Sequence, residues 1–217
     1  MATSMRNEPV LLAVARGHVE GTLELPEQPV GVVLFAHGSG SSRMSPRNNQ
    51  VAAALREARM GTLLMDLLTP VEDHDVKSRF DIALLTQRLD MAVDFLRGHD
   101  VAGSLPLGLF GASTGAAAAL QLAAMRGAEV AAVVSRGGRP DLAGPAALAK
   151  VSAPTLLIVG GLDDVVIELN RMAYDAMQCE KRLDIVPGAT HLFEEPGTLD
   201  KVAELATAWF ASHFSKH

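Results

Sequence analysis

The sequence predicts an α/β protein whose central sheet is mostly parallel, has about eight strands and carries helices on both faces. Short apolar runs alternate with helix-type patterns along the chain, which is typical of this class. Two of these runs, VGVVLFA at 30–36 and VAAVVS at 130–135, are apolar throughout, as in strands buried on both faces of a parallel sheet. No repeat or linker divides the 217 residues, so we expect a single domain over 1–217.

The composition excludes several classes of function. A net charge of −6 offers no basic surface to nucleic acid. No apolar run approaches the roughly 20 residues that a membrane span needs, and residues 1–10 lack the pattern of a signal peptide. Cys179 is the single cysteine, so no internal disulfide is expected. We therefore expect a cytoplasmic protein without nucleic-acid or membrane partners, and a homodimer is left open as its oligomeric state.

The elements are predicted to begin with a β-hairpin and then to alternate. Ile82, Leu85 and Leu89 recur at helical spacing and predict the longest helix, whereas residues 69–78 are polar and are expected to be irregular. The predicted strands are 10–14, 18–25, 30–36, 60–68, 107–110, 130–135, 155–159 and 181–186. The predicted helices are 50–59 (with a start near Pro46), 79–97, 114–126, 146–150, 169–178 and 199–213.

A serine lies at the turn between a predicted strand and a predicted helix, in the stretch LGLFGASTG at 107–115. This context favours a nucleophile at Ser113, because a sharp strand-to-helix turn exposes the hydroxyl at the end of the sheet. Glycine at 111 and 115 allows close backbone approach, and the helix start supplies N–H groups, among them that of Thr114, for a developing oxyanion. The alternative is a glycine-rich turn with a capping serine.

A serine hydroxyl needs a base, and two of the seven histidines are candidates. His191 follows the last predicted strand, so it shares with Ser113 the edge where the strands end. We expect it to be the base. His37 also follows a strand but leads directly into HGSG at 37–40, and we expect it to orient that loop, with the role of base as an alternative.

Two adjacent carboxylates, Asp163 and Asp164, follow the predicted strand at 155–159. The side chains of neighbours diverge, so only one of them is expected to face His191 and hold its tautomer. The other would be an N-cap or first-turn carboxylate of the next helix.

The loop at 37–40 is expected to supply the second oxyanion donor, through the N–H of Ser39 or alternatively of Gly40. Its small residues, Gly38 and Gly40, would let the backbone approach a substrate. A phosphate-binding loop is the alternative, but the stretch lacks the later glycine and lysine of such motifs.

Charged residues near the same edge have two interpretations. Arg136 and Arg139 would bind a substrate carboxylate, or would form salt bridges with Asp66 or Asp141. The acidic run at 72–75 is expected to be a solvated loop, with metal coordination as the alternative.

Four motifs together resemble the α/β-hydrolase superfamily: HGSG after a strand, GASTG, GGLDDVV and GATHLF. The small size and the lack of a large insertion resemble its dienelactone-hydrolase-like branch, and the resemblance covers about Val30 to Phe210. It implies an α/β-hydrolase fold without a large lid domain. The family spacing G-x-x-D-x-x-V falls on Gly160, Asp163 and Val166. The site residues that the resemblance implies are Ser113 as nucleophile, His191 as base, Asp163 as acid, and Thr114 and Ser39 as oxyanion donors.

One departure from that family bears on the substrate. Dienelactone hydrolases carry cysteine as nucleophile, whereas the corresponding residue here is Ser113. We therefore expect a carboxylesterase-like serine hydrolase that cleaves small esters through an acyl-enzyme, without metal or cofactor. The alternatives are a thioesterase, a peptidase or an acyltransferase using the same residues, or a non-catalytic binding protein.

Overall fold

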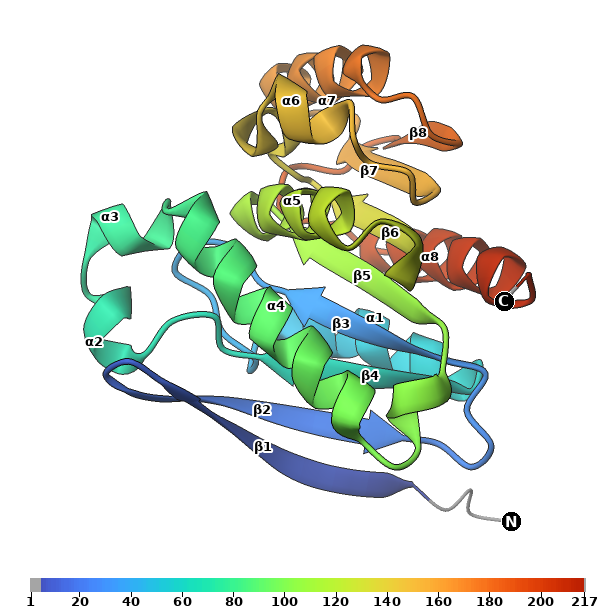
Figure 1. The fold of residues 1–217 in the computed structure, drawn as a ribbon. Coiled ribbons are helices and arrows are strands. Elements are labelled where there is room, and N and C mark those ends of the chain that lie inside the picture. The colour runs from blue at the N-terminus through green and yellow to red at the C-terminus, as the bar shows by residue number, and fades with distance from the viewer. Residues whose placement is uncertain (1–4, 217) are drawn as a thin grey trace.

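The structure is a computed structural model that describes residues 5–216. Its sheet has eight strands in the order β1-β2-β4-β3-β5-β6-β7-β8, as Figure 1 shows. The strands are β1 (Arg6–Val14), β2 (Gly17–Leu25), β3 (Gly31–Ala36), β4 (Met60–Met65), β5 (Leu107–Ala112), β6 (Val130–Arg136), β7 (Thr155–Gly160) and β8 (Lys181–Val186). The predicted α/β class and the mostly parallel sheet are confirmed.

The direction of the strands decides where a site can form. The β1–β2 hairpin is antiparallel, and β2 is antiparallel to β4. From β4 to β8, neighbouring strands run parallel, so their carboxyl ends meet at one edge. Every residue of β3 to β7 is buried, which explains why these strands read as continuous apolar runs.

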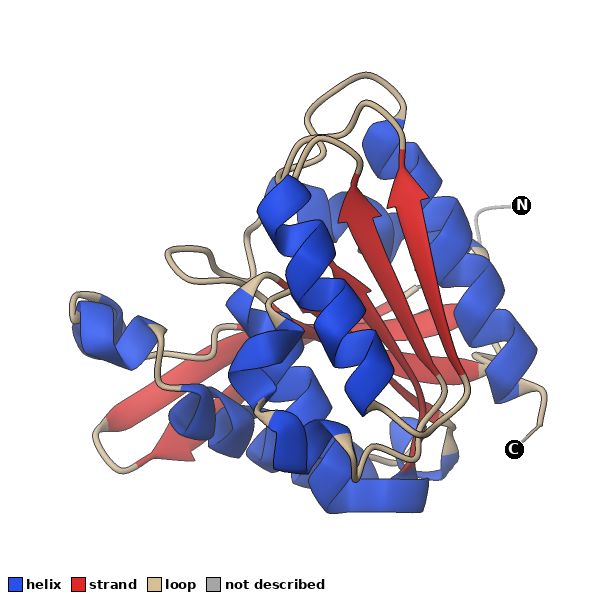
Figure 2. Ribbon diagram, turned by 90° about the horizontal axis from the view of Figure 1, so that it is seen from above, coloured by secondary structure: helices blue, strands red, loops and turns tan. Residues whose placement is uncertain are grey.

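Helices cover both faces of the sheet (Figures 1 and 2). In Figure 1, α4 (Ile82–Gly98) and α5 (Thr114–Arg126) lie on the near face, and α1 (Pro46–Glu57) and α8 (Thr198–Phe214) lie behind. Each pair packs helix against helix and encloses its own hydrophobic cluster with the sheet. The remaining long helix, α7 (Asp164–Ala176), follows β7 and also contacts β8.

The connection after β6 contains no lid domain. It consists of the 3-10 turn η3 (Pro140–Ala143) and the single helical turn α6 (Pro145–Leu148). Two further 3-10 turns are η1 (Ala102–Ser104) and η2 (Gly127–Glu129). No helix within residues 5–216 is long and apolar enough to cross a membrane.

Two predictions about helices are wrong, and helix capping explains the first of them. The polar stretch 69–78 contains two short helices, α2 (Pro70–Asp73) and α3 (Val76–Arg79). Thr69 and Glu72 form a capping box at the first, and the Asp75 side chain caps the second. Helix α7 begins at Asp164, five residues before the predicted start at 169, so Asp163 immediately precedes the helix and Asp164 lies in its first turn.

Candidate active site

Ser113 occupies a strained turn between β5 and α5. Its φ angle is +50°, in a region that residues with a side chain rarely adopt. Three backbone hydrogen bonds hold it there. The Ser113 N–H donates to the Arg136 carbonyl at 3.3 Å, and the Ser113 carbonyl accepts from the N–H groups of Ala116 at 3.1 Å and Arg139 at 3.0 Å. The end of β6 and the loop after it therefore fix the conformation of the serine.

The two glycines of the GASTG stretch are required by close contacts of the backbone. A methyl group on Gly111 would lie 2.4 Å from Ala116 Cα, and one on Gly115 would lie 2.2 Å from the Ala36 carbonyl oxygen. Both distances are far below van der Waals contact. The first glycine lets α5 fold back on β5, and the second lets α5 start against the end of β3.

His191 and Asp163 are hydrogen bonded. Nδ1 of His191 lies 2.7 Å from Oδ2 of Asp163. The aspartate follows β7 and the histidine follows β8, at the edge where β5 ends in Ser113. The Asp163 side chain is 17% exposed and that of His191 is 38% exposed, so the carboxylate is screened while the imidazole remains accessible. Asp164 is exposed at the first turn of α7, where a negative charge suits the helix dipole.

The segment at 136–137 lies between Ser113 and His191. Arg136 accepts the Ser113 N–H through its carbonyl, and a methyl group on Gly137 would lie 3.5 Å from His191 Nδ1. Among the described residues, no hydrogen bond joins the Ser113 hydroxyl to His191.

The loop after β3 packs directly against the serine turn. A methyl group on Gly38 would lie 3.0 Å from Ser113 Cβ. The Ser39 N–H donates to Oγ1 of Thr114 at 2.9 Å, a contact that the sequence did not indicate. Thr114 is the first residue of α5, so its own N–H has no acceptor inside the helix. Gly40 has a φ of +70° and lies near Arg79 instead.

Both ring nitrogens of His37 are engaged in holding the loop. Nε2 accepts the Leu67 N–H at 3.0 Å, and Nδ1 lies 2.9 Å from the Gly38 carbonyl, to which it donates. Burial lowers the pKa of His37, so the ring is neutral. This geometry agrees with the expectation that His37 orients the loop, and it leaves neither nitrogen for Ser113.

Arg139 and Arg136 differ in their partners. Arg139 forms a bidentate salt bridge with Asp141, with two N–O distances of 2.8 Å, and this pairing raises its pKa. Of the two interpretations of Arg139, the structure therefore supports the salt bridge. The other candidate carboxylate, Asp66, pairs with Arg43.

Arg136 is a buried cation without a carboxylate partner among the described residues. Its Nη2 lies 3.3 Å from Asn48 Oδ1, and its guanidinium lies 5.9 Å from the centre of the Phe193 ring. Nε is buried without a hydrogen-bond partner in the described part of the chain. Burial and the nearby charge of Arg47 lower the pKa of Arg136 to about 10.

The carboxylates of the acidic run serve helix caps and ion pairs. Glu72 pairs with Arg88, Asp73 accepts from Arg79, and Asp75 caps α3. Within residues 5–216, no group of three or more His, Cys, Asp or Glu side chains is arranged to hold a metal ion. Cys179 is half-buried, and this burial raises the pKa of its thiol.

Comparison with known sequences identifies the family of the chain. The sequence profile of the dienelactone hydrolase family matches residues 47–215. The chain belongs to the dienelactone hydrolase family. This confirms the resemblance and the α/β-hydrolase fold predicted from the four motifs.

The similar structures include a dienelactone hydrolase and esterases. A dienelactone hydrolase from Anabaena variabilis is 52% identical, with a TM-score of 0.91 over 96% of this chain and 98% of that one. Est1E from Butyrivibrio proteoclasticus has a TM-score of 0.82 over 95% of this chain and 99% of that one. At 15% identity, this second likeness shows the fold alone.

A Mycobacterium tuberculosis protein, named as a candidate phosphoribosyl transferase, is 54% identical over 209 residues. The match covers 96% of this chain and 47% of that protein. This member of the dienelactone hydrolase family thus spans about half the length of the curated relatives that it matches.

Proposed function

We propose that this chain is a carboxylesterase-like serine hydrolase with Ser113 as nucleophile, His191 as base and Asp163 as the acid that orients it. The observation that carries the proposal is the 2.7 Å contact between His191 Nδ1 and Asp163 Oδ2, at the sheet edge where β5 ends in Ser113. A carboxylate on Nδ1 leaves Nε2 as the nitrogen that takes a proton from a serine hydroxyl. Membership of a hydrolase family supports the same chemistry.

The reaction has two acyl-transfer steps. Ser113 Oγ attacks the ester carbonyl as His191 takes its proton, and the tetrahedral oxyanion accepts from the Thr114 N–H. The Ser39 N–H becomes the second donor when it turns from Thr114 Oγ1 to the oxyanion. The intermediate collapses as His191 protonates the leaving alcohol. Water, deprotonated by His191, then releases the acid from Ser113.

Ser113→Ala is the first test. We expect at least about a 10³-fold loss of p-nitrophenyl acetate hydrolysis, because the nucleophile is removed, and loss of labelling by a phosphonate serine probe. The matched control is Ser152→Ala, which changes an exposed serine away from the site and leaves both readouts unchanged. Equal labelling and equal rates for Ser113→Ala and the unsubstituted chain would rule the proposal out.

For the substrate, we propose an ester that carries a carboxylate recognised by Arg136. A buried guanidinium without a counter-ion is costly, and an anionic substrate group would supply the missing charge. Gly38 and Gly40 would let the oxyanion loop approach the same substrate.

A matched pair of esters tests this recognition. We expect the chain to prefer mono-p-nitrophenyl glutarate over p-nitrophenyl valerate in kcat/KM, and Arg136→Met to reduce that preference about tenfold or more. Arg139→Gln is the matched control, because Arg139 is already paired with Asp141. If Arg136→Met and the unsubstituted chain prefer the glutarate ester to the same extent, Arg136 does not bind the substrate carboxylate.

The thioesterase, peptidase and acyltransferase alternatives use the same acyl-enzyme and differ only in the leaving group or the acceptor. A panel of thioesters, amides and acceptor alcohols separates them. The transferase name belongs to relatives about twice as long, and we propose hydrolase chemistry for the part that this chain matches. A cytoplasmic location and the absence of nucleic-acid, membrane and cofactor requirements remain expectations from composition.

A further inference from the structure

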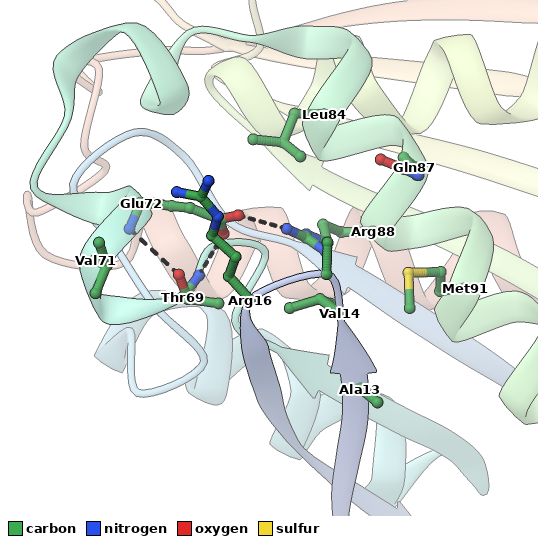
Figure 3. A pocket seen from close by; sticks show the side chains of 11 residues that line it. Ala13, Val14, Arg16, Thr69, Val71, Glu72, Leu84, Gln87, Arg88 and Met91 are labelled. Atoms are coloured by element: carbon green, nitrogen blue, oxygen red, sulfur yellow. Dashed lines mark hydrogen bonds and ion pairs between the residues drawn. The ribbon is translucent and has the colours of Figure 1, made fainter.

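A cavity lies outside the candidate active site. It has a volume of about 700 Å³ and is lined by the tip of the β1–β2 hairpin, by α2 and by α4 (Figure 3). Leu84, Arg88 and Met91 recur at helical spacing, so one face of α4 forms a wall of the cavity. None of the residues proposed for catalysis lines this cavity.

Arg88 is a buried cation with a hydrogen-bond donor that no described residue accepts from. Its side chain is 6% exposed and pairs with Glu72, with 2.6 Å between Nη2 and Oε1. The other Glu72 oxygen accepts the Thr69 N–H at 2.8 Å, so the capping box uses the rest of this carboxylate. Nε of Arg88 is buried and has no hydrogen-bond partner among the described residues. Glu72 alone therefore does not satisfy the guanidinium.

Arg16 adds a second cation. In Figure 3 its side chain rises from the hairpin tip into the cavity. No ion pair or hydrogen bond joins this side chain to any residue in 5–216. Among the described residues that line the cavity, Glu72 is the only carboxylate, so the two arginines leave a net charge of +1.

Apart from Thr69 and Gln87, the rest of the wall is apolar. Val14 comes from the hairpin, and Leu84 and Met91 come from α4. The volume lies within the range of small-molecule sites, roughly 300–1,000 Å³. An ion pair that merely fixed α2 to α4 would need neither an apolar hollow of this size nor an unpaired arginine at its mouth.

We propose that this cavity binds a small monocarboxylate with an apolar body. The carboxylate would pair with Arg16 and lie beside the Arg88 guanidinium, because guanidinium groups match carboxylates in geometry and charge. The apolar body would lie against Val14, Leu84 and Met91. One negative charge neutralises the cavity. A cation would add to the positive charge, and a neutral amide could accept a hydrogen bond but would leave that charge uncompensated.

Octanoate is a suitable probe, observed on the full chain with ¹³C-labelled methionine methyl groups. Met91 reports on the cavity, and Met44, exposed in the loop that follows β3, is a control methyl group that does not line it. We expect saturable shifts of the Met91 methyl signal without shifts of Met44, and octanamide at the same concentration to produce at least about tenfold weaker binding. Because no turnover is measured, this result does not depend on the hydrolase proposal.

Two variants complete the test. Arg16→Gln removes an exposed charge that has no ion-pair partner among the described residues. Arg88→Lys keeps the charge beside Glu72 but loses the forked hydrogen-bond donor of the guanidinium. We expect each variant to weaken octanoate binding about tenfold. Arg171→Gln, an exposed arginine on α7, is the matched control and leaves the affinity unchanged. The proposal is overturned if Met91 does not respond, if Met44 responds instead, or if Arg16→Gln binds octanoate as tightly as the control.

Discussion

Asp163 and Asp164 are neighbours in sequence, but helix α7 begins between them and gives them different surroundings. Asp163 is the residue before the helix, and its carboxylate contacts His191. Asp164 is inside the first turn and points to solvent. From the residues alone this choice stayed open, because it depends on where α7 starts, which the sequence predicted five residues too late.

The two aspartates can be compared directly. We expect Asp163→Asn to lower kcat for p-nitrophenyl acetate by roughly 10³–10⁴-fold, because the amide no longer stabilises the imidazolium or holds the tautomer. Asp164→Asn has the same change in charge and is expected to leave kcat within about threefold, as a surface contribution to the helix dipole. If the two losses were similar, or reversed in order, the assignment of Asp163 would be wrong.

At the scale of elements, His37 connects the end of β3 to the chain leaving β4. It accepts the Leu67 N–H and donates to the Gly38 carbonyl, so one neutral ring holds two backbone segments. Sequence reasoning predicted that His37 orients the loop but could not identify its partner, because Leu67 is 30 residues away. The same limit applies to the contact between Ser39 and Thr114, which are 75 residues apart.

The neutral state of His37 predicts how stability depends on pH. Its folded-state pKa is lowered, so the unfolded chain takes up the proton first, near pH 6.5. Above that pH His37 contributes no pH dependence. Below it, the free energy of unfolding falls by up to about 1.4 kcal/mol per pH unit because of this group.

Urea unfolding at pH 7.5, 6.5 and 5.5 measures this effect. We expect the loss of stability between pH 6.5 and 5.5 to be smaller in His37→Gln than in the unsubstituted chain. The exposed His18 provides a matched control, and His18→Gln should follow the unsubstituted chain. Parallel curves for His37→Gln and the unsubstituted chain would mean that His37 is not the titrating group.

At the scale of the whole molecule, the parallel order of strands explains why the candidate site was largely predictable. Loops that follow β3, β5, β7 and β8 all reach the same edge, so motifs at strand ends point to one place even when they lie far apart in the chain. Continuous apolar runs identified the buried strands for the same reason.

What could not be predicted depends on contacts between elements. The cavity beside Arg88 needs the hairpin tip and α4 to be placed relative to each other, and no local pattern contains that information. Arg136 and Arg139 looked equivalent in the sequence. Only the folded chain shows that one is paired with Asp141 and the other is buried without a carboxylate partner among the described residues.

The backbone of Ser113 has a consequence for engineering. A φ of +50° costs little for glycine and of order 1–3 kcal/mol for residues with a Cβ. Ser113→Gly therefore removes strain that Ser113→Ala retains. A library of variants sorted by heat resistance alone would accumulate glycine at position 113 and discard the proposed nucleophile, so a thermostable version of this chain has to be selected for hydrolysis at the same time.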